Sequence, residues 1–190
     1  PEWFIESCKK ISYLFPRAHA VAYVMMAFRI AWFKVYHPLA FYAAYFSIRA
    51  KAFDLRIMTG DLKTQMTEFN RIKALDRGAS PKDKDLMSAL EVSMEMYQRG
   101  YRFVNVDIQH SEARRFSIKD GALLPPFLAI DSLGETVADA IVAEREERPF
   151  TSLKDLQRRC KVSNTIIDLM KELKCCGELP EDEQMSLFGA

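Results

Sequence analysis

Three side chains with the chemistry to hold a nucleotide lie near the start of one apolar segment. His19 and Tyr23 are four residues apart and would share one face of a helix, and Arg17 comes just before them. A cation, an imidazole and a phenol at a helix N-terminus can bind a triphosphate and stack on a base. The alternative is a histidine in the protein core with the tyrosine beside it. On spacing alone, this alternative is the commoner outcome.

A second candidate site is a tight turn between two apolar helical segments within residues 127–141. Ser132, Leu133 and Gly134 would form the turn, with Gly134 allowing the chain to turn closely, and Thr136 would lie in the first turn of the next helix. The first amides of that helix would point outward, so a nucleic-acid phosphate could bind there without readout of the bases. The alternative is an ordinary helical hairpin with no ligand.

A weaker second copy of this hairpin follows. Ser163 would cap a helix through Ile166, Ile167 and Met170, and Gly177 would turn the chain after it. Two such copies can bury one shared core and straddle a duplex. Basic residues between the copies would suit contacts to a phosphate backbone, with Arg158 and Arg159 as the predicted DNA contacts. The full set is Arg145, Arg148, Lys154, Arg158, Arg159 and Lys161, and most of them, taken singly, are expected to be solvated surface charges.

A short peptide near the end of the chain combines a polar anchor with two large apolar side chains. It consists of Gln184, Met185, Ser186, Leu187 and Phe188. Burying Leu187 and Phe188 in a pocket of a partner would gain about 1.5–3 kcal/mol for each side chain, and ordering the segment offsets part of that gain. The peptide is therefore predicted to dock on a partner protein. The alternative is a tail that folds back onto its own domain.

Composition narrows the remaining classes of function. A chain of 190 residues that is 49% hydrophobic can form a packed core, and a net charge of +1 leaves no global basic field. The four cysteines form no CxxC pair and have no histidine at zinc-finger spacing, so free thiols in a reducing cytoplasm are expected. Cys175 and Cys176 are neighbours and could be redox-active. The apolar stretch from Ala20 to Phe28 falls short of a bilayer span, and no signal peptide or membrane is expected.

The elements that must position these groups are predicted to be mainly helices with a small β patch, an α+β fold. A helix over residues 18–34, apolar on almost all sides, should be buried or line a cleft, and His37-Pro38 should end it. Further helices are predicted over 39–49, over 61–77 and from Ser80 to Gly100. Two or three short strands should lie between residues 102 and 124, and short helices should return from Phe127.

In their order, these motifs resemble the fingers and duplex-binding regions of bacterial DNA polymerase III alpha chains, most closely the PolC type of Gram-positive bacteria. The turn resembles the helix-hairpin-helix family, whose usual Gly-Leu-Gly has its first glycine replaced here by Ser132. The tail peptide resembles the bacterial clamp-binding pentapeptide, commonly Gln-Leu-Ser-Leu-Phe. The other matching segments are Cys8 to Ile11, Phe15 to Tyr23, Ala31 to Lys34, His37 to Leu39, Ala43 to Phe46, Phe103 to Asp107 and Leu124 to Phe127.

The resemblance implies roles for these residues. Phe15, Arg17, His19 and Tyr23 match the nucleotide-facing positions of a fingers helix that closes over the incoming dNTP. Arg17 stands where lysine is usual and keeps the positive charge. The paired hairpins match a domain that grips the primer-template duplex, and residues 184–188 match the peptide that binds the sliding clamp.

Neither a catalytic residue nor a metal ligand is predicted within this chain. Asp83 and Asp85 lie in a polar helix start, where solvated first-turn carboxylates are expected. In the family, aspartates of a palm hold two Mg²⁺ ions, and that palm would lie upstream in the parent polypeptide, so the chain alone should not polymerise. The fingers region should expose apolar patches that pack on this palm.

The resemblance implies that the chain is the C-terminal part of a PolC-type polymerase, and its start at Pro1 within a helical pattern argues against a free-standing protein. Residues 1–100 would be fingers, 101–179 a duplex-binding domain with tandem hairpins, and 180–190 a flexible tail. The expected partners are primer-template DNA, the dNTP, the sliding clamp and the rest of the polymerase. One alternative is a free-standing helix-hairpin-helix adaptor that tethers the clamp. Another is a repair or nucleotide-hydrolysing enzyme, for which the carboxylate cluster and phosphate loop are missing.

Overall fold

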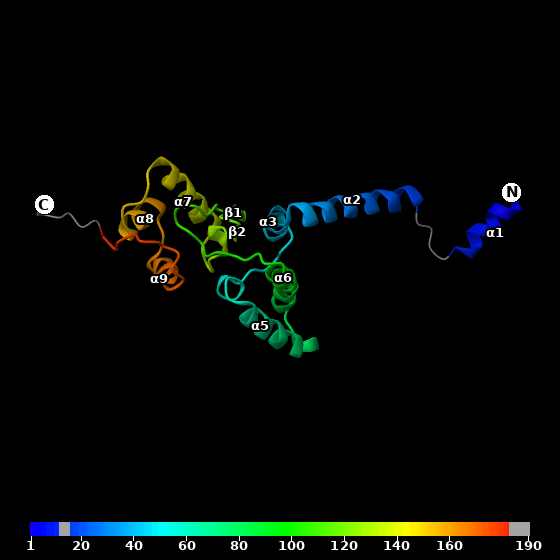
Figure 1. The fold of residues 1–190 in the computed structure, drawn as a ribbon, viewed down its shortest axis with the longest axis horizontal. Helices are drawn as coiled ribbons and strands as arrows, with labels where there is room; N and C mark the ends of the chain where they lie inside the picture. Colours follow the sequence, from blue (N-terminus) through cyan, green and yellow to red (C-terminus); the bar gives the residue numbers. More distant parts are fainter. Residues whose placement is uncertain (12–15, 183–190) are drawn as a thin grey trace, which may run out of the picture. The chain divides into compact units, whose positions relative to one another are not determined.

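The computed structural model describes residues 1–11 and 16–182, which form a mainly helical chain with one small sheet, as predicted (Figure 1). The chain divides into two compact units. Unit 1 spans Pro1–Phe41 and unit 2 spans Tyr42–Ala190. This boundary differs from residue 100, the predicted end of the fingers region. That region was defined by its expected function, so its limit stays a prediction.

Unit 1 contains two helices, α1 (Glu2–Lys10) and α2 (Arg17–Tyr36). The predicted break at His37-Pro38 is confirmed, because α2 ends at Tyr36 and α3 (Pro38–Ile48) begins at the proline. The backbone N–H of His37 still donates to the carbonyl of Phe33 at 2.8 Å. Helix α3 crosses the boundary between the two units.

Helix α2 was expected to be buried or to line a cleft, and the structure corrects the first of these alternatives. No residue of α1 or α2 is buried, and Phe28 is 74% exposed. Phe28, Trp32 and Phe33 help to line an open apolar groove of about 460 Å³. The helix is apolar on almost every side, so its exposed surface is largely apolar. The predicted exposed apolar patches are present on α2, whereas its assignment to a fingers region stays a prediction.

The same helix also has the length and composition of a membrane span. It has 20 residues, ~30 Å of helix, with a mean hydropathy of 1.2 over its most apolar window. The apolar stretch from Ala20 to Phe28 therefore underestimated the length of this apolar helix. A single helix of this kind is weak evidence for a membrane, because core helices and signal sequences pass the same test.

The first half of unit 2 is built around a pair of helices, α5 and α6, which pack against each other. Ser80 caps α6 as predicted, in a capping box in which its hydroxyl accepts from the Asp83 amide and the Asp83 carboxylate accepts from the Ser80 amide. Asp83 is therefore a first-turn carboxylate, as expected. The elements of this half are α4 (Leu55–Met58), α5 (Leu62–Ala74), the 3₁₀ turn η1 (Asp76–Gly78) and α6 (Pro81–Gln98).

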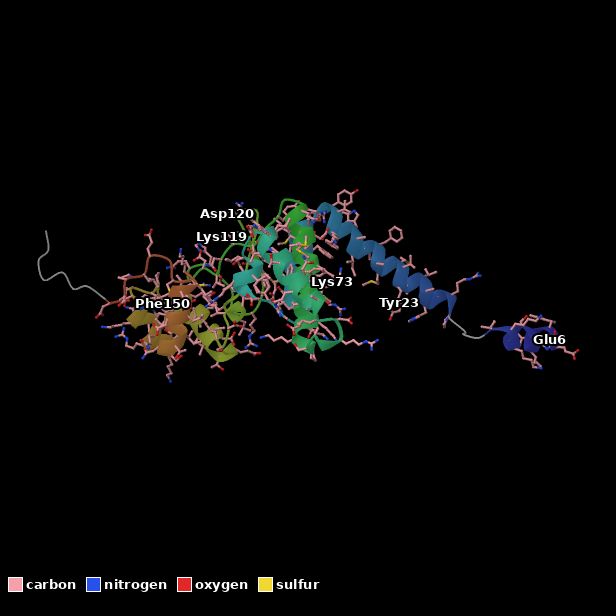
Figure 2. The ribbon with its side chains drawn as sticks, turned by 90° about the horizontal axis from the view of Figure 1, so that it is seen from below. Glu6, Tyr23, Lys73, Lys119, Asp120 and Phe150 are labelled. Atoms are coloured by element: carbon pink, nitrogen blue, oxygen red, sulfur yellow. The ribbon has the colours of Figure 1, made fainter. Side chains whose placement is uncertain are left out.

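The predicted β patch is a two-stranded antiparallel sheet. Strands β1 (Ser117–Lys119) and β2 (Ala122–Leu124) are joined at Asp120 and Gly121, whose φ angles are +49° and +75° (Figure 2). Positive φ at both residues is what a two-residue hairpin turn requires. Phe103 adds a single bridge to β2. The rest of the segment before β1 is irregular rather than extended, although Phe103, Val106 and Ile108 within it are buried.

The second half of unit 2 consists of the 3₁₀ turn η2 (Phe127–Ala129) and the helices α7 (Glu135–Glu147), α8 (Leu153–Cys160) and α9 (Asn164–Glu172). Ile141 of α7, Leu156 of α8 and Met170 of α9 are fully buried in one cluster with Phe127. The two predicted hairpins therefore share a single core.

Candidate nucleic-acid interface

The first hairpin turn holds a non-glycine residue in the left-handed region of backbone space. Ser132 has a φ of +63°. The Leu133 amide donates to the Ile130 carbonyl at 3.2 Å, and the Leu133 side chain is buried. Ser132, Gly134 and Thr136 are exposed around the turn. Of the hairpin residues predicted to bind DNA, three can therefore face a ligand, and Leu133 instead fixes the turn to the core.

Gly134 is not needed for the closeness of the turn, contrary to the expectation from the sequence. It is the N-cap of α7, with φ −76° and ψ 156°, a conformation open to any residue. A Cβ at this position would meet nothing within 4 Å. Among the described residues, no side chain caps α7, whereas Asp or Ser side chains cap α4, α5, α6, α8 and α9. The glycine thus leaves the first amides of α7 open to an approaching group.

The second hairpin turn repeats the backbone pattern of the first. Lys161 has a φ of +54°, the Val162 side chain is buried, and Ser163 caps α9. These residues follow Ser132, Leu133 and Gly134 at a constant spacing of 29. The sequence identified Ser163 but missed Lys161 and Val162 as turn residues. The signal was the repeated order of a polar residue, a branched apolar residue and a capping residue.

Acidic side chains beside the first turn are paired with one arginine. The Arg114 guanidinium contacts the Glu135 carboxylate at 2.5 Å and forms two hydrogen bonds to Asp139. The hydrogen bond from Arg114 is the main reason why the pKa of Asp139 lies below its ordinary value. The single positive charge of the arginine cancels one of the two carboxylate charges of α7 and so reduces their repulsion of an anion approaching the turn.

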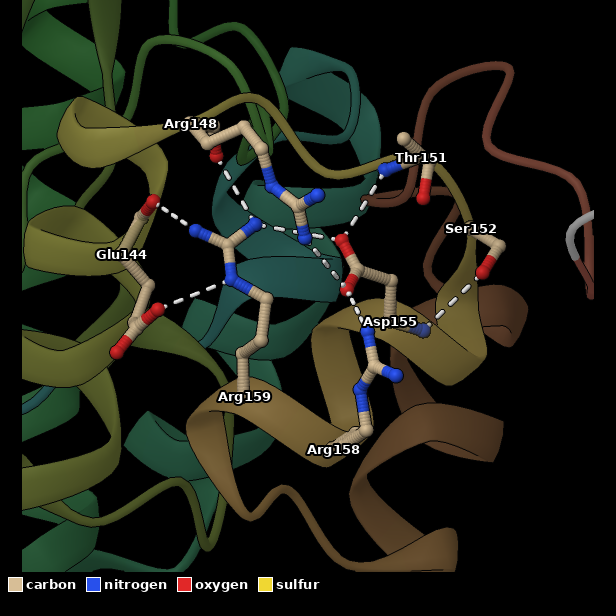
Figure 3. A network of polar contacts seen from close by, with 7 residues as sticks. All are labelled: Glu144, Arg148, Thr151, Ser152, Asp155, Arg158 and Arg159. Carbon is tan, nitrogen blue, oxygen red and sulfur yellow. Dashed lines mark hydrogen bonds and ion pairs between the residues drawn. The ribbon is translucent and has the colours of Figure 1, made fainter.

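Asp155 at the start of α8 is the buried centre of a polar network whose outer arginines are exposed (Figure 3). Its carboxylate accepts from the guanidinium of Arg158 at 2.8 Å, and from those of Arg148 and Arg159 at 3.3 Å each. The Thr151 amide contributes a further bond at 3.4 Å. Burial raises the pKa of Asp155, but the hydrogen bonds from Arg158, Thr151 and Arg159 outweigh it, so the pKa lies below its ordinary value.

Arg159 belongs to this network rather than to an exposed surface. Its side chain is 11% exposed, pairs with Glu144 at 2.9 Å and lies 4.8 Å from the centre of the Phe150 ring. The predicted DNA contact at Arg159 is therefore replaced by a structural role, because its guanidinium is enclosed by these partners. The Arg158 side chain is 72% exposed and can still reach a ligand.

The predicted nucleotide-facing residues lie together on α2. The rings of His19 and Tyr23 are 4.5 Å apart in an edge-to-face arrangement, and both side chains are exposed. Figure 2 shows Tyr23 on α2. The alternative of a core histidine is not what this chain shows. Arg17 is the first residue of α2, whose N-cap Pro16 offers no capping side chain. Phe15 lies outside the described residues.

The predicted docking peptide, residues 184–188, lies outside the described residues, and its role stays a prediction. Within residues 1–11 and 16–182, no three His, Cys, Asp or Glu side chains gather in a way that could hold a metal ion. Burial raises the pKa of Cys175 to about 12 and that of Cys160 to about 11, and Cys176 is also buried, which disfavours reactive thiolates.

Comparison with known proteins points to one family. A family described as the helix-hairpin-helix motif matches residues 100–184. The chain is 49% identical over 188 residues to a DNA polymerase III PolC-type of Caldanaerobacter subterraneus subsp. tengcongensis. It is 50% and 48% identical over 191 residues to proteins of the same name from Streptococcus suis and Streptococcus pyogenes. Each alignment covers 99% of this chain and 13% of the relative. The chain therefore belongs to the PolC-type DNA polymerase III family, as a segment that spans 13% of the length of these relatives.

Proposed function

We propose that this chain is the DNA-handling segment of a replicative DNA polymerase. Its paired hairpins would grip the primer-template duplex, the start of α2 would position the incoming dNTP, and residues 184–188 would dock on the sliding clamp. The reaction served is the transfer of a deoxynucleotide to a primer 3′ end with release of pyrophosphate. The observation that carries the proposal is the repeated turn, because the two copies share one backbone pattern on one core.

The geometry of both turns favours phosphate as the ligand. Open amides at the start of α7 and the positive end of its dipole suit an anion, and the missing side chain at Gly134 permits close approach. At the second turn, Lys161 is exposed and has no ion-pair partner in the described part of the chain. Contacts of this kind position a duplex without reading its sequence. Duplex binding is tested by the Gly134 experiment argued in the Discussion.

The exposed groups at the start of α2 support a role in binding the nucleotide. Arg17 can pair with phosphate oxygens, and the edge-to-face pair of His19 and Tyr23 offers an aromatic surface for a base. The two Mg²⁺ ions of the reaction would be held by the palm outside this segment. No cluster of ligands among the described residues competes for them. This chain would then contribute by positioning the dNTP and by holding the duplex.

We predict that Tyr23→Ala in the full-length polymerase raises the KM for dNTP about tenfold, as expected for the loss of one stacking contact. The matched control is Tyr36→Ala, which removes the same exposed ring from the other end of α2. Steady-state kinetics with a primed template would measure both. An effect of Tyr23→Ala on melting temperature without a change in KM would contradict the nucleotide role.

We predict that the double substitution Leu187→Ala with Phe188→Ala abolishes binding of the polymerase to the sliding clamp. Each truncation removes burial worth about 1.5–3 kcal/mol, which together exceed a hundredfold in affinity. Surface plasmon resonance on immobilised clamp would measure the loss. Ile48→Ala with Ile118→Ala, two exposed apolar residues of unit 2, is the control and should leave clamp binding intact. Unchanged binding of the tail variant would exclude residues 184–188 as the docking peptide.

A further inference from the structure

A row of basic side chains extends along α8 from the second hairpin turn. Lys154, Arg158 and the C-cap Lys161 are spaced by four and three residues, so they share one face of the helix. All three are exposed, and their positions lie about 4–6 Å apart along an axis that advances ~1.5 Å per residue. We call these three residues the α8 stripe. A row of cations that begins at a proposed phosphate site suits the backbone of a nucleic acid.

An acidic part of the same chain covers the far end of the α8 stripe. Pro180, Glu181 and Asp182, which were predicted to begin a flexible tail, contact α8 and α9 instead. The carbonyl of Pro180 accepts from the Leu153 amide at 2.9 Å, and the carbonyl of Glu181 accepts from the Lys154 amide at 3.2 Å. Both amides lie in the first turn of α8 and have no partner within the helix. We call residues 180–182 the acidic cover.

Two ion pairs place the carboxylates of the acidic cover on lysines. The Lys154 ammonium pairs with Asp182, and Lys171 of α9 contacts the Glu181 carboxylate at 2.8 Å. The hydrogen bond between Lys171 and Glu181 raises the pKa of the lysine and lowers that of the glutamate, as expected when both partners are charged. All four side chains are between 38% and 80% exposed, so each pair is weak and open to exchange with a competing anion.

The surroundings of Lys154 leave room for such an anion. A hollow of about 530 Å³ lies on α8, and Ser152, Lys154, Arg158 and Asp182 are among the residues that line it. The Arg158 guanidinium is bound to the buried Asp155, but its side chain is 72% exposed and can meet a second anion. The pairing of Asp182 with Lys154 at this hollow shows that a negative group is accepted there.

We propose that the acidic cover is an internal mimic of DNA phosphates, whose two carboxylates occupy cations that a bound duplex would otherwise contact. Duplex binding then exchanges carboxylate for phosphate at Lys154 and Lys171. The inference rests on the proposed grip of the duplex by the second hairpin. A duplex carries one negative charge per ~1.7 Å of its axis, so it competes with the two carboxylates more effectively than an isolated anion does. The acidic cover thereby keeps isolated anions off this surface.

The test measures duplex binding by the full-length polymerase without the clamp. Glu181→Gln with Asp182→Asn removes both charges of the acidic cover and keeps its size and its backbone carbonyls. The Kd for a duplex should fall about fivefold, because two exposed ion pairs no longer have to be broken. The matched control is Glu146→Gln with Glu147→Gln, two adjacent exposed carboxylates of α7 that form no ion pair in the described part of the chain. This control changes the net charge equally and should leave the Kd unchanged.

A substitution at Lys154 separates direct competition from a general effect of charge. In the native protein, Lys154→Gln loses a phosphate contact but also an ion pair that the duplex must break, so the Kd should rise only about twofold. In the variant without the two carboxylates, the same substitution loses the phosphate contact alone, and the Kd should rise about fivefold. An equal rise in both backgrounds would show that Glu181 and Asp182 repel DNA only at a distance, and it would overturn the proposal.

Lys161→Gln distinguishes this inference from the function on which it rests. It should weaken duplex binding severalfold with and without the two carboxylates of the acidic cover. If it does, an unchanged Kd for Glu181→Gln with Asp182→Asn would overturn the acidic cover alone, as would equally tighter binding by the control at Glu146 and Glu147. If Lys161→Gln binds the duplex normally, the grip by the second turn is wrong, and the competition proposed for the acidic cover is overturned with it.

Discussion

Asp155→Asn should lower the free energy of unfolding of residues 42–190 by about 3–5 kcal/mol, the usual cost of removing one partner from a buried ion pair. The carboxylate is 2% exposed and accepts from three guanidinium groups. Asparagine keeps the volume but replaces an acceptor oxygen with an N–H₂ group that points at other donors. Arg159, itself nearly enclosed, loses a charge partner at the same time.

The same substitution should change how stability depends on pH. The folded-state pKa of Asp155 lies below its ordinary value. Its contribution is therefore fully present above the unfolded pKa of about 3.9 and is lost as pH falls through the lower, folded-state value. Urea unfolding followed by circular dichroism at pH 7 and at successively lower pH would measure both effects. The difference between the native protein and Asp155→Asn should narrow as the solution becomes more acidic.

Asp139→Asn is the matched control for this experiment. Asp139 also pairs with an arginine, but both side chains are 49% exposed, so water replaces much of what the pair provides. The control should change stability little at either pH. A loss below about 1 kcal/mol for Asp155→Asn would show that the network holds α7 and α8 no more strongly than a surface pair.

Much of the fold follows from local signals in the sequence. The break at His37-Pro38 and the N-cap at Ser80 were predicted from proline chemistry and a capping residue, and the structure confirms them. The shared core of the hairpins, which was expected from the way such hairpins pair, is also present. The pattern is informative there because each signal acts within a few residues. Buried apolar side chains before β1 looked like strand residues, since periodicity reports burial and not hydrogen bonding.

The surroundings of a charged or apolar side chain were not predictable in the same way. Arg158 and Arg159 are neighbours in one basic run, yet one is largely exposed and the other is enclosed. Which arginine meets Glu144 and Asp155 depends on how α7 packs on α8, and spacing along one helix does not encode that. The wrong prediction that α2 is buried has a related cause. A helix that is apolar on all sides is expected to be covered, but its sequence does not identify the residues that cover it.

Gly134 allows the fold and the phosphate site to be tested separately, because a side chain there can fit the backbone and still block the ligand. Gly134→Asp should stabilise the fold by roughly a few tenths of a kcal/mol, because aspartate is a slightly better N-cap than glycine and its Cβ would meet nothing within 4 Å. The same carboxylate would occupy the amides offered to phosphate and repel it, so duplex binding should weaken by more than tenfold. A variant that gains stability and loses binding separates the ligand site from the fold.

Fluorescence anisotropy with two duplexes of unrelated sequence would measure this loss, which should be equal on both because the turn contacts only the backbone. The dependence of log Kd on log salt should also become shallower by about one phosphate contact. Thr67→Asp, which adds the same charge at an exposed site on α5, is the control and should leave binding unchanged. A loss confined to one duplex sequence would show base readout and contradict the hairpin as a phosphate site. Unchanged binding to both duplexes would mean that the first turn does not face DNA, and the grip would then fall to the second turn at Lys161 and Ser163.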